Sequence, residues 1–249
     1  MFPLFDDNPH GGRSYVNWAL MGLCVLVFVW QAGLSEQDGQ EAVYVFGMIP
    51  AVLFHSLQLP DDIAVVPAWA TLVTSMFLHG GVMHLAGNML YLWIFGDNVE
   101  EALGHGRFLV FYLLCGVAAA LTQAMLDPGS RIPMVGASGA ISGVLGAYFL
   151  LFPRANVKVI MFPFGLVYVP ALIVLGLWFL LQLLDGLRAP ADDKGGVAFW
   201  AHVGGFVAGM VLLPLLKPRH VPYFARGHHR PFQLVRKKRD PADGPWGRR

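Results

Sequence analysis

The sequence predicts an all-α polytopic membrane protein with six transmembrane helices. Of its 249 residues, 56% are hydrophobic and only 13% are charged, so the chain is far more apolar than a soluble domain. Each of six windows lacks charged residues and is long enough to cross about 30 Å of hydrocarbon as a helix. The windows cover residues 14–35, 63–96, 108–126, 132–153, 159–184 and 195–216. Their unbroken apolar runs favour helices over the alternating strands of a membrane barrel.

The first two windows need separate treatment. Residues 14–35 follow Arg13 and could form a cleaved signal peptide, but VFVWQAGLSEQ offers no small-x-small cleavage site. The run is also longer than a typical signal-peptide core, so we expect a retained anchor. Residues 63–96 would form a helix of about 51 Å, too long for one crossing. We expect it to split at Gly80-Gly81, with the second part in the bilayer and the first at the interface.

The distribution of basic residues predicts the orientation. If the N-terminus is cytoplasmic, 14 of the 17 Lys and Arg residues face the cytoplasm, and the external loop 34–69 holds five acidic residues and no basic one. This pattern follows the positive-inside rule and places both termini on the inner side of the cell membrane. Residues 1–14 are then a cytoplasmic tail and residues 15–217 the membrane domain.

Residues 218–249 form a third region, a basic cytoplasmic tail that we expect to be disordered. Its RKKRD segment has neither a folded module nor interleaved aromatic residues, so we expect contact with anionic lipid headgroups and not with nucleic acid. Cys24 and Cys115 both fall within predicted spans. We expect them to be packing residues without a disulfide. No feature of the sequence specifies an oligomeric state.

Polar residues within the spans indicate function, because a polar side chain in hydrocarbon is costly. Span two contains His84 and Asn88, span four Ser138 and span six His202. With a cytoplasmic N-terminus, all three helices run inward from the outer face. At about 1.5 Å per residue, the four side chains lie about 5–12 Å below that face and can share one layer.

The spacing within the motifs supports one shared site. His84 and Asn88 are four residues apart and therefore lie on one helical face. Small residues at regular spacing allow spans four and six to approach closely; they are Gly136, Gly139 and Gly143 on span four, and Gly205 and Gly209 on span six. A short distance between Ser138 and His202 is therefore plausible.

Each polar residue taken alone also has an ordinary structural interpretation. A serine in a membrane helix commonly bonds the carbonyl four residues earlier, and a histidine commonly bonds a neighbouring helix. We expect Ser142 to be a packing residue and His79 to lie at the interface. The shared side and depth of the four candidates favours a joint site instead.

Two chemistries could use such a site. Zinc would need about three ligands, for which His79, His84 and His202 are available. Their spacing in HGGVMH does not match the HExxH pair, and no carboxylate is nearby to act as base, so we expect neither a metal nor another cofactor. Acyl transfer needs a nucleophile, a base and oxyanion donors. Ser138, His202 and the pair of His84 and Asn88 meet these needs.

Three motifs, in order, resemble those of the rhomboid intramembrane serine proteases: HGGVMHLAGNMLYLW, GASGAISG and AHVGGFVAG. VEEALGHGRF also resembles the E-x-x-x-G element of that family, and the likeness extends over residues 69–210. It implies a six-helix rhomboid-like bundle with a Ser-His dyad, in which Ser138 is the nucleophile and His202 the general base. It further implies an oxyanion hole made by the His84 and Asn88 side chains and the Ser138 N–H, with Gly136 starting the GxSG loop.

The resemblance also implies substrates and a gate. Rhomboids cleave single-pass membrane proteins in or near their transmembrane helix, without metal or nucleotide, and relatives suggest the fifth span, 159–184, as the gate. The chain departs from many relatives in having Trp69-Ala70 in place of Trp-Arg, and Ser142 in place of a tyrosine that stacks on the histidine. Support for the His202 ring must therefore come from elsewhere.

Hydrolysis within a bilayer needs water, so spans two, four and six are expected to enclose a cavity open to the outer face. Turnover is expected to be slow, because no carboxylate assists the base. A non-catalytic rhomboid-like scaffold that binds transmembrane helices is the alternative. A transporter is disfavoured, because no pair of interrupted repeats occurs in the sequence.

Overall fold

The computed structural model describes residues 2–8, 12–161, 165–188, 198–225 and 232. Helices account for most of them: α1 (Tyr15–Ala32), α2 (Glu36–Phe46), α3 (Pro50–Leu53), α4 (Thr71–Thr74), the 3-10 helix η1 (Ser75–Phe77), α5 (Val82–Leu103), α6 (His105–Leu126), α7 (Ser138–Leu151), α8 (Ala171–Arg188) and α9 (Phe199–Leu216). Three strands complete the described elements: β1 (Phe2–Asp6), β2 (Asn156–Met161) and β3 (Gly165–Pro170).

Within the described residues, four helices are long and apolar enough to cross a membrane, namely α1, α6, α8 and α9. α7 is apolar but has only 14 residues. α5 has 22 residues, and its last two turns carry Asp97, Glu100 and Glu101. The chain is therefore a helical membrane protein. The predicted split of the second window is also found, because η1 ends at Phe77 and α5 begins directly after Gly81.

The three strands depart from the all-α prediction. β2 and β3 form an antiparallel hairpin in which Val157 pairs with Val169 and Val159 with Val167, and all four valines are buried. Because alternate residues of a strand share a face, this period-2 placement of β-branched residues suits a sheet. The hairpin occupies the start of the window predicted as a fifth helix at 159–184, so α8 begins only at Ala171.

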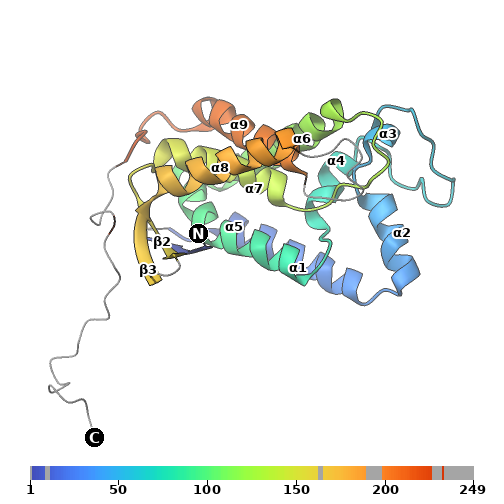
Figure 1. Ribbon diagram of the computed structural model, residues 1–249, viewed down its shortest axis with the longest axis horizontal. Coiled ribbons are helices and arrows are strands. Elements are labelled where there is room, and N and C mark those ends of the chain that lie inside the picture. The colour runs from blue at the N-terminus through green and yellow to red at the C-terminus, as the bar shows by residue number, and fades with distance from the viewer. Residues whose placement is uncertain (1, 9–11, 162–164, 189–197, 226–231, 233–249) are drawn as a thin grey trace, which may run out of the picture.

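The N-terminal segment, predicted as a tail, contributes β1 as a third strand. β1 pairs antiparallel with β2, giving the strand order β1-β2-β3. In Figure 1 the sheet lies at one end of the helical bundle, and α2, α3 and α4 lie at the opposite end. The N-terminal strand and the segment after α7 therefore share one end of the molecule. Residues 226–231 and 233–249, most of the tail predicted to be disordered, lie outside the described residues.

A buried carboxyl group ties the strand β1 to α7. The Tyr148 hydroxyl on α7 donates a hydrogen bond of 2.5 Å to Asp6 Oδ2. Burial, with the nearby charges of Asp97 and Asp7, raises the pKa of Asp6 to about 7, although the Tyr148 hydrogen bond acts against this rise. The C-terminal end of α7 is thus anchored to the N-terminal strand.

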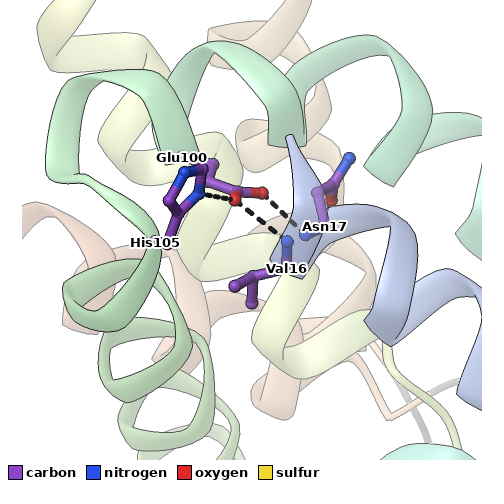
Figure 2. A network of polar contacts seen from close by, with 4 residues as sticks. All are labelled: Val16, Asn17, Glu100 and His105. Carbon is purple, nitrogen blue, oxygen red and sulfur yellow. Dashed lines mark hydrogen bonds and ion pairs between the residues drawn. The ribbon is translucent and has the colours of Figure 1, made fainter. Parts of the chain in front are cut away.

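A second buried carboxylate joins α1, α5 and α6 (Figure 2). Glu100, only 1% exposed, accepts hydrogen bonds from the backbone N–H groups of Val16 at 3.0 Å and Asn17 at 2.6 Å. It therefore caps the first turn of α1, where N–H groups lack helical partners and the helix dipole favours negative charge. His105 Nδ1 lies 2.5 Å from the same carboxylate.

The E-x-x-x-G element consequently has a structural meaning. Gly104 adopts a positive φ of 81°, which a residue with a side chain rarely adopts, and it lets α6 start directly after α5. This tight corner brings His105 to the Glu100 carboxylate. Cys24 and Cys115 are free and fully buried, as expected for packing residues.

Candidate active site

Glycine residues bring α7 and α9 into direct backbone contact. A Cβ atom at Gly205 would overlap the Gly139 carbonyl oxygen and lie 3.0 Å from its carbon, and a Cβ at Gly209 would overlap the Gly143 carbonyl oxygen. Carbon atoms normally pack about 3.5–4.0 Å apart, so a side chain would force the helices to separate. The predicted close approach of these helices is therefore found at these four glycines.

Gly136, which we predicted with that group, lies elsewhere. A Cβ at this residue would lie 2.7 Å from two atoms of the His84 ring on α5. Its φ of 125° also falls in the region that favours glycine. The Gly136 N–H donates to the Ser75 carbonyl oxygen at 2.8 Å, which holds the loop before α7 in place. Gly136 thus allows the loop, and not α9, to pass close to His84.

The contact between α7 and α9 brings Ser138 and His202 together. Ser138 is the first residue of α7, and its Oγ lies 2.8 Å from His202 Nε2 on α9. This is an ordinary hydrogen-bond distance, and His202 is only 8% exposed. The two side chains, from residues that are 64 positions apart in sequence, are therefore paired across two helices.

Ser142, one turn further along α7, behaves as a packing residue. It is buried, and its hydroxyl donates to the Ser138 carbonyl oxygen at 2.6 Å. Such a bond to the residue four positions earlier is the usual behaviour of serine within a helix. The two serines of GASGAISG thus differ in role, because the Ser138 hydroxyl is hydrogen-bonded to a histidine of another helix.

Two residues of α8 support the His202 ring, and the sequence did not identify either of them. Gln182 Oε1 lies 2.7 Å from His202 Nδ1. The Trp178 ring packs beside the imidazole, with centroids 5.8 Å apart and planes inclined by 39°. Trp178 and Gln182 are four residues apart and share a face of α8. The sequence did contain a signal for them, namely a glutamine one turn after a tryptophan within an apolar span.

His84 and Asn88 of α5 lie beside the loop that precedes Ser138. The Gly80 N–H donates to His84 Nδ1 at 3.3 Å, so the neutral ring carries its proton on Nε2, the nitrogen directed toward Gly136. Asn88 Nδ2 is buried and has no hydrogen-bond partner among the described residues. Buried donors are normally paired, so this unpaired one, which lies beside Gly136, is suited to bind a ligand oxygen.

His79, predicted to lie at the membrane interface, is buried within the protein, in the loop before α5. It is only 2% exposed, and its ring packs edge-on against His84 with centroids 5.3 Å apart. The Gln31 side chain of α1 accepts a hydrogen bond from the His79 N–H at 3.0 Å. His79 is thus enclosed by protein because α1 covers the loop before α5.

These side chains border one cavity of about 1020 Å³, whose lining includes His84, Asn88, Gly136, Ser138, Trp178 and His202. Its volume matches that of large ligand sites. Polar groups within a membrane protein are tolerated where they line such a cavity and not lipid. Among the described residues, no three His, Cys, Asp or Glu side chains are placed to hold a metal ion.

Comparison with known proteins identifies the class. The model of the rhomboid domain family matches residues 66–219, more than half of the chain. The chain therefore belongs to the rhomboid family. It is 36% identical over 141 residues to rhomboid protease GluP of Bacillus subtilis, covering 57% of this chain and 25% of that protein. It is 33% identical over 147 residues to mitochondrial rhomboid protein 1 of Saccharomyces cerevisiae, covering 57% and 40%.

The family includes both proteases and inactive proteins. Inactive rhomboid protein 1 of Drosophila melanogaster is 28% identical over 179 residues, covering 72% of this chain and 11% of that protein. The chain thus spans well under two thirds of the length of these relatives. Membership of the family establishes a helical membrane protein related to serine proteases and to inactive homologues.

Proposed function

We propose that this protein is an intramembrane serine endopeptidase that cleaves single-pass membrane proteins in or near their transmembrane segment. The hydrogen-bond distance of 2.8 Å between Ser138 Oγ and His202 Nε2 is the observation that carries the proposal. A serine becomes nucleophilic when a neighbouring base accepts its proton, and a neutral imidazole is such a base.

The proposed reaction has two stages. His202 Nε2 accepts the Ser138 proton as Oγ attacks the scissile carbonyl carbon, and the imidazolium then gives that proton to the leaving amine. Water next attacks the acyl-enzyme ester, with His202 again accepting a proton, and the Ser138 hydroxyl is restored. The cavity of about 1020 Å³ offers room for both the peptide and this water.

The oxyanion that forms in each stage is assigned to donors beside Gly136. His84 Nε2–H, the unpaired Asn88 amide and the Ser138 N–H at the start of α7 are the proposed donors. Donors that are already oriented toward the developing charge stabilise it without reorganisation. Because Gly136 has no side chain, nothing at this position displaces His84 from its place.

We further propose six spans in the cell membrane, with α5 and α7 joining the four helices that are long and apolar enough by themselves. Both termini would be cytoplasmic, and the site would open to the outer face. The excess of basic residues in the tails and in the predicted inner loops supports this orientation. The shared position of β1 and the segment after α7 agrees with it, because both fall on the predicted inner side.

The test uses purified protein in detergent micelles with a single-pass model substrate. We expect cleavage by the wild-type protein and labelling of Ser138 by a fluorophosphonate. Ser138→Ala and His202→Ala should each remain folded and abolish cleavage, and Asn88→Ala should lower the rate by about 10²-fold. Cleavage retained in either dyad variant would refute the dyad. Binding of substrate without cleavage by the wild-type protein would support the scaffold alternative, to which the inactive Drosophila relative points.

A further inference from the structure

Both ring nitrogens of His202 have hydrogen-bond partners, and one of these partners can only accept. Nδ1 lies 2.7 Å from the Gln182 amide oxygen, which can only accept a hydrogen bond. A neutral imidazole carries one proton, and this contact places it on Nδ1. Nε2 is then free to accept the hydrogen bond of the Ser138 hydroxyl at 2.8 Å. Gln182 therefore selects the tautomer that a general base requires.

Gln182 holds the ring from behind the cavity. It is partly buried and is not among the described residues that line the cavity, whereas Trp178, one turn earlier on α8, does line it. The tryptophan packs against the ring and the glutamine bonds its edge, so α8 limits both the tilt and the rotation of the imidazole. A histidine with two such contacts can keep one orientation.

We propose that Gln182 is a positioning residue that holds His202 in the tautomer and orientation needed for general-base catalysis. It takes the place that a carboxylate occupies in a catalytic triad. An amide oxygen stabilises the imidazolium less than a carboxylate does, but a neutral amide costs less to bury within the membrane domain. This inference rests on the proposed function, because it assigns His202 the role of base.

Proton transfer stays balanced in this arrangement. The proton on Nδ1 remains shared with Gln182 Oε1 throughout the reaction. The Ser138 proton moves to Nε2 and then to the leaving amine, so Gln182 gains and loses no proton. Its contribution is to orient the ring and to stabilise the cation that forms when Nε2 is protonated.

The test compares three variants of the full chain in detergent. Gln182→Met keeps a side chain of similar length but removes the acceptor, and Gln182→Glu keeps an acceptor and adds charge. Leu181→Met, at an adjacent exposed position on α8, is the matched control. The assay measures kcat and KM separately on the single-pass substrate, and then kcat/KM against pH.

We expect Gln182→Met to lower kcat roughly 10- to 100-fold, as for loss of a hydrogen bond to a charged group, with KM changed less than about twofold. Gln182→Glu should restore most of kcat and move the acidic limb of the pH profile to higher pH, because a negative charge favours the protonated imidazole. A residue that only packs α8 would not move that limb. Wild-type kcat in Gln182→Met, or an unmoved limb in Gln182→Glu, would overturn the assignment.

A second readout does not depend on activity. In protein labelled with 15N-histidine, NMR should show a hydrogen-bonded Nδ1 proton that is lost in His202→Ala and in Gln182→Met. A wild-type His202 protonated on Nε2 would overturn the inference. Failure of the proposed function would look different, because the wild-type protein would then cleave no faster than Ser138→Ala while the Nδ1 proton remained.

Discussion

The substitution Gly205→Ala tests whether the contact between α7 and α9 controls the proposed dyad. The new Cβ would lie 3.0 Å from the Gly139 carbonyl carbon and overlap its oxygen. The overlap with the oxygen is the tighter of the two contacts, and relieving it requires the helices to separate by about 1 Å or more. Gly139 is adjacent to Ser138, and Gly205 lies one turn after His202. The distance from Ser138 Oγ to His202 Nε2 should therefore rise from 2.8 Å to about 3.8 Å or more, beyond a good hydrogen bond.

We expect this variant to fold but to cleave about 10²-fold more slowly, because a displacement of about 1 Å at a catalytic group costs that much. Overpacking costs about 1–3 kcal/mol of stability, and the higher helix propensity of alanine offsets about 1 kcal/mol. Gly22→Ala in α1 is the control, since nothing lies within 4 Å of its added Cβ. The measurements are the cleavage rate, fluorophosphonate labelling of Ser138 and the thermal midpoint. A folded Gly205→Ala protein with the wild-type rate would refute the reasoning.

Two further predictions concern buried carboxyl groups. Burial raises the pKa of Asp6 from 3.8 to about 7, so the folded protein keeps this proton after the unfolded chain has lost it. The resulting stabilisation is complete below about pH 4 and is lost as the pH rises through 7. Between pH 5 and 8 the wild-type protein should lose about 2–3 kcal/mol that Asp6→Asn does not lose; equal pH dependence of the two thermal midpoints would contradict this. Glu100→Ala leaves the N–H groups of Val16 and Asn17 unpaired, which should cost about 2–6 kcal/mol of unfolding free energy. Denaturant titration checks this value, and Glu41→Ala, at an exposed position, serves as the control. Equal stability of the Glu100→Ala and Glu41→Ala proteins would argue against the capping role.

The motifs predicted much of the candidate site because helical geometry is local. The spacing of His84 and Asn88 already places them on one face, and both border the cavity next to Ser138. The glycines at 139, 143, 205 and 209 predicted a close helix pair because only glycine permits backbone contact, and the structure shows that contact. The break at Gly80-Gly81 was equally visible in the sequence, and α5 begins there.

Other features depended on pairing between distant segments. Charge-free windows cannot separate a buried strand from a helix, so β2 and β3 were missed in the window predicted as the fifth helix, and β1 in a segment predicted as a tail. The strand β1 forms only because β2, more than 150 residues later, offers it a partner. Strand pairing is a non-local interaction that local hydropathy does not report.

The sequence by itself determined the membrane class, the family motifs and which residues could meet, because composition and helical periodicity are properties of neighbouring residues. Only the tertiary structure decided that Ser138 Oγ and His202 Nε2 lie 2.8 Å apart, and that Gln182 bonds the other side of that ring. The substitution of Ser142 for an aromatic residue left the support of His202 open in the sequence. Trp178 and Gln182 supply it from α8, because helix packing sets the approach of side chains that sequence spacing leaves free.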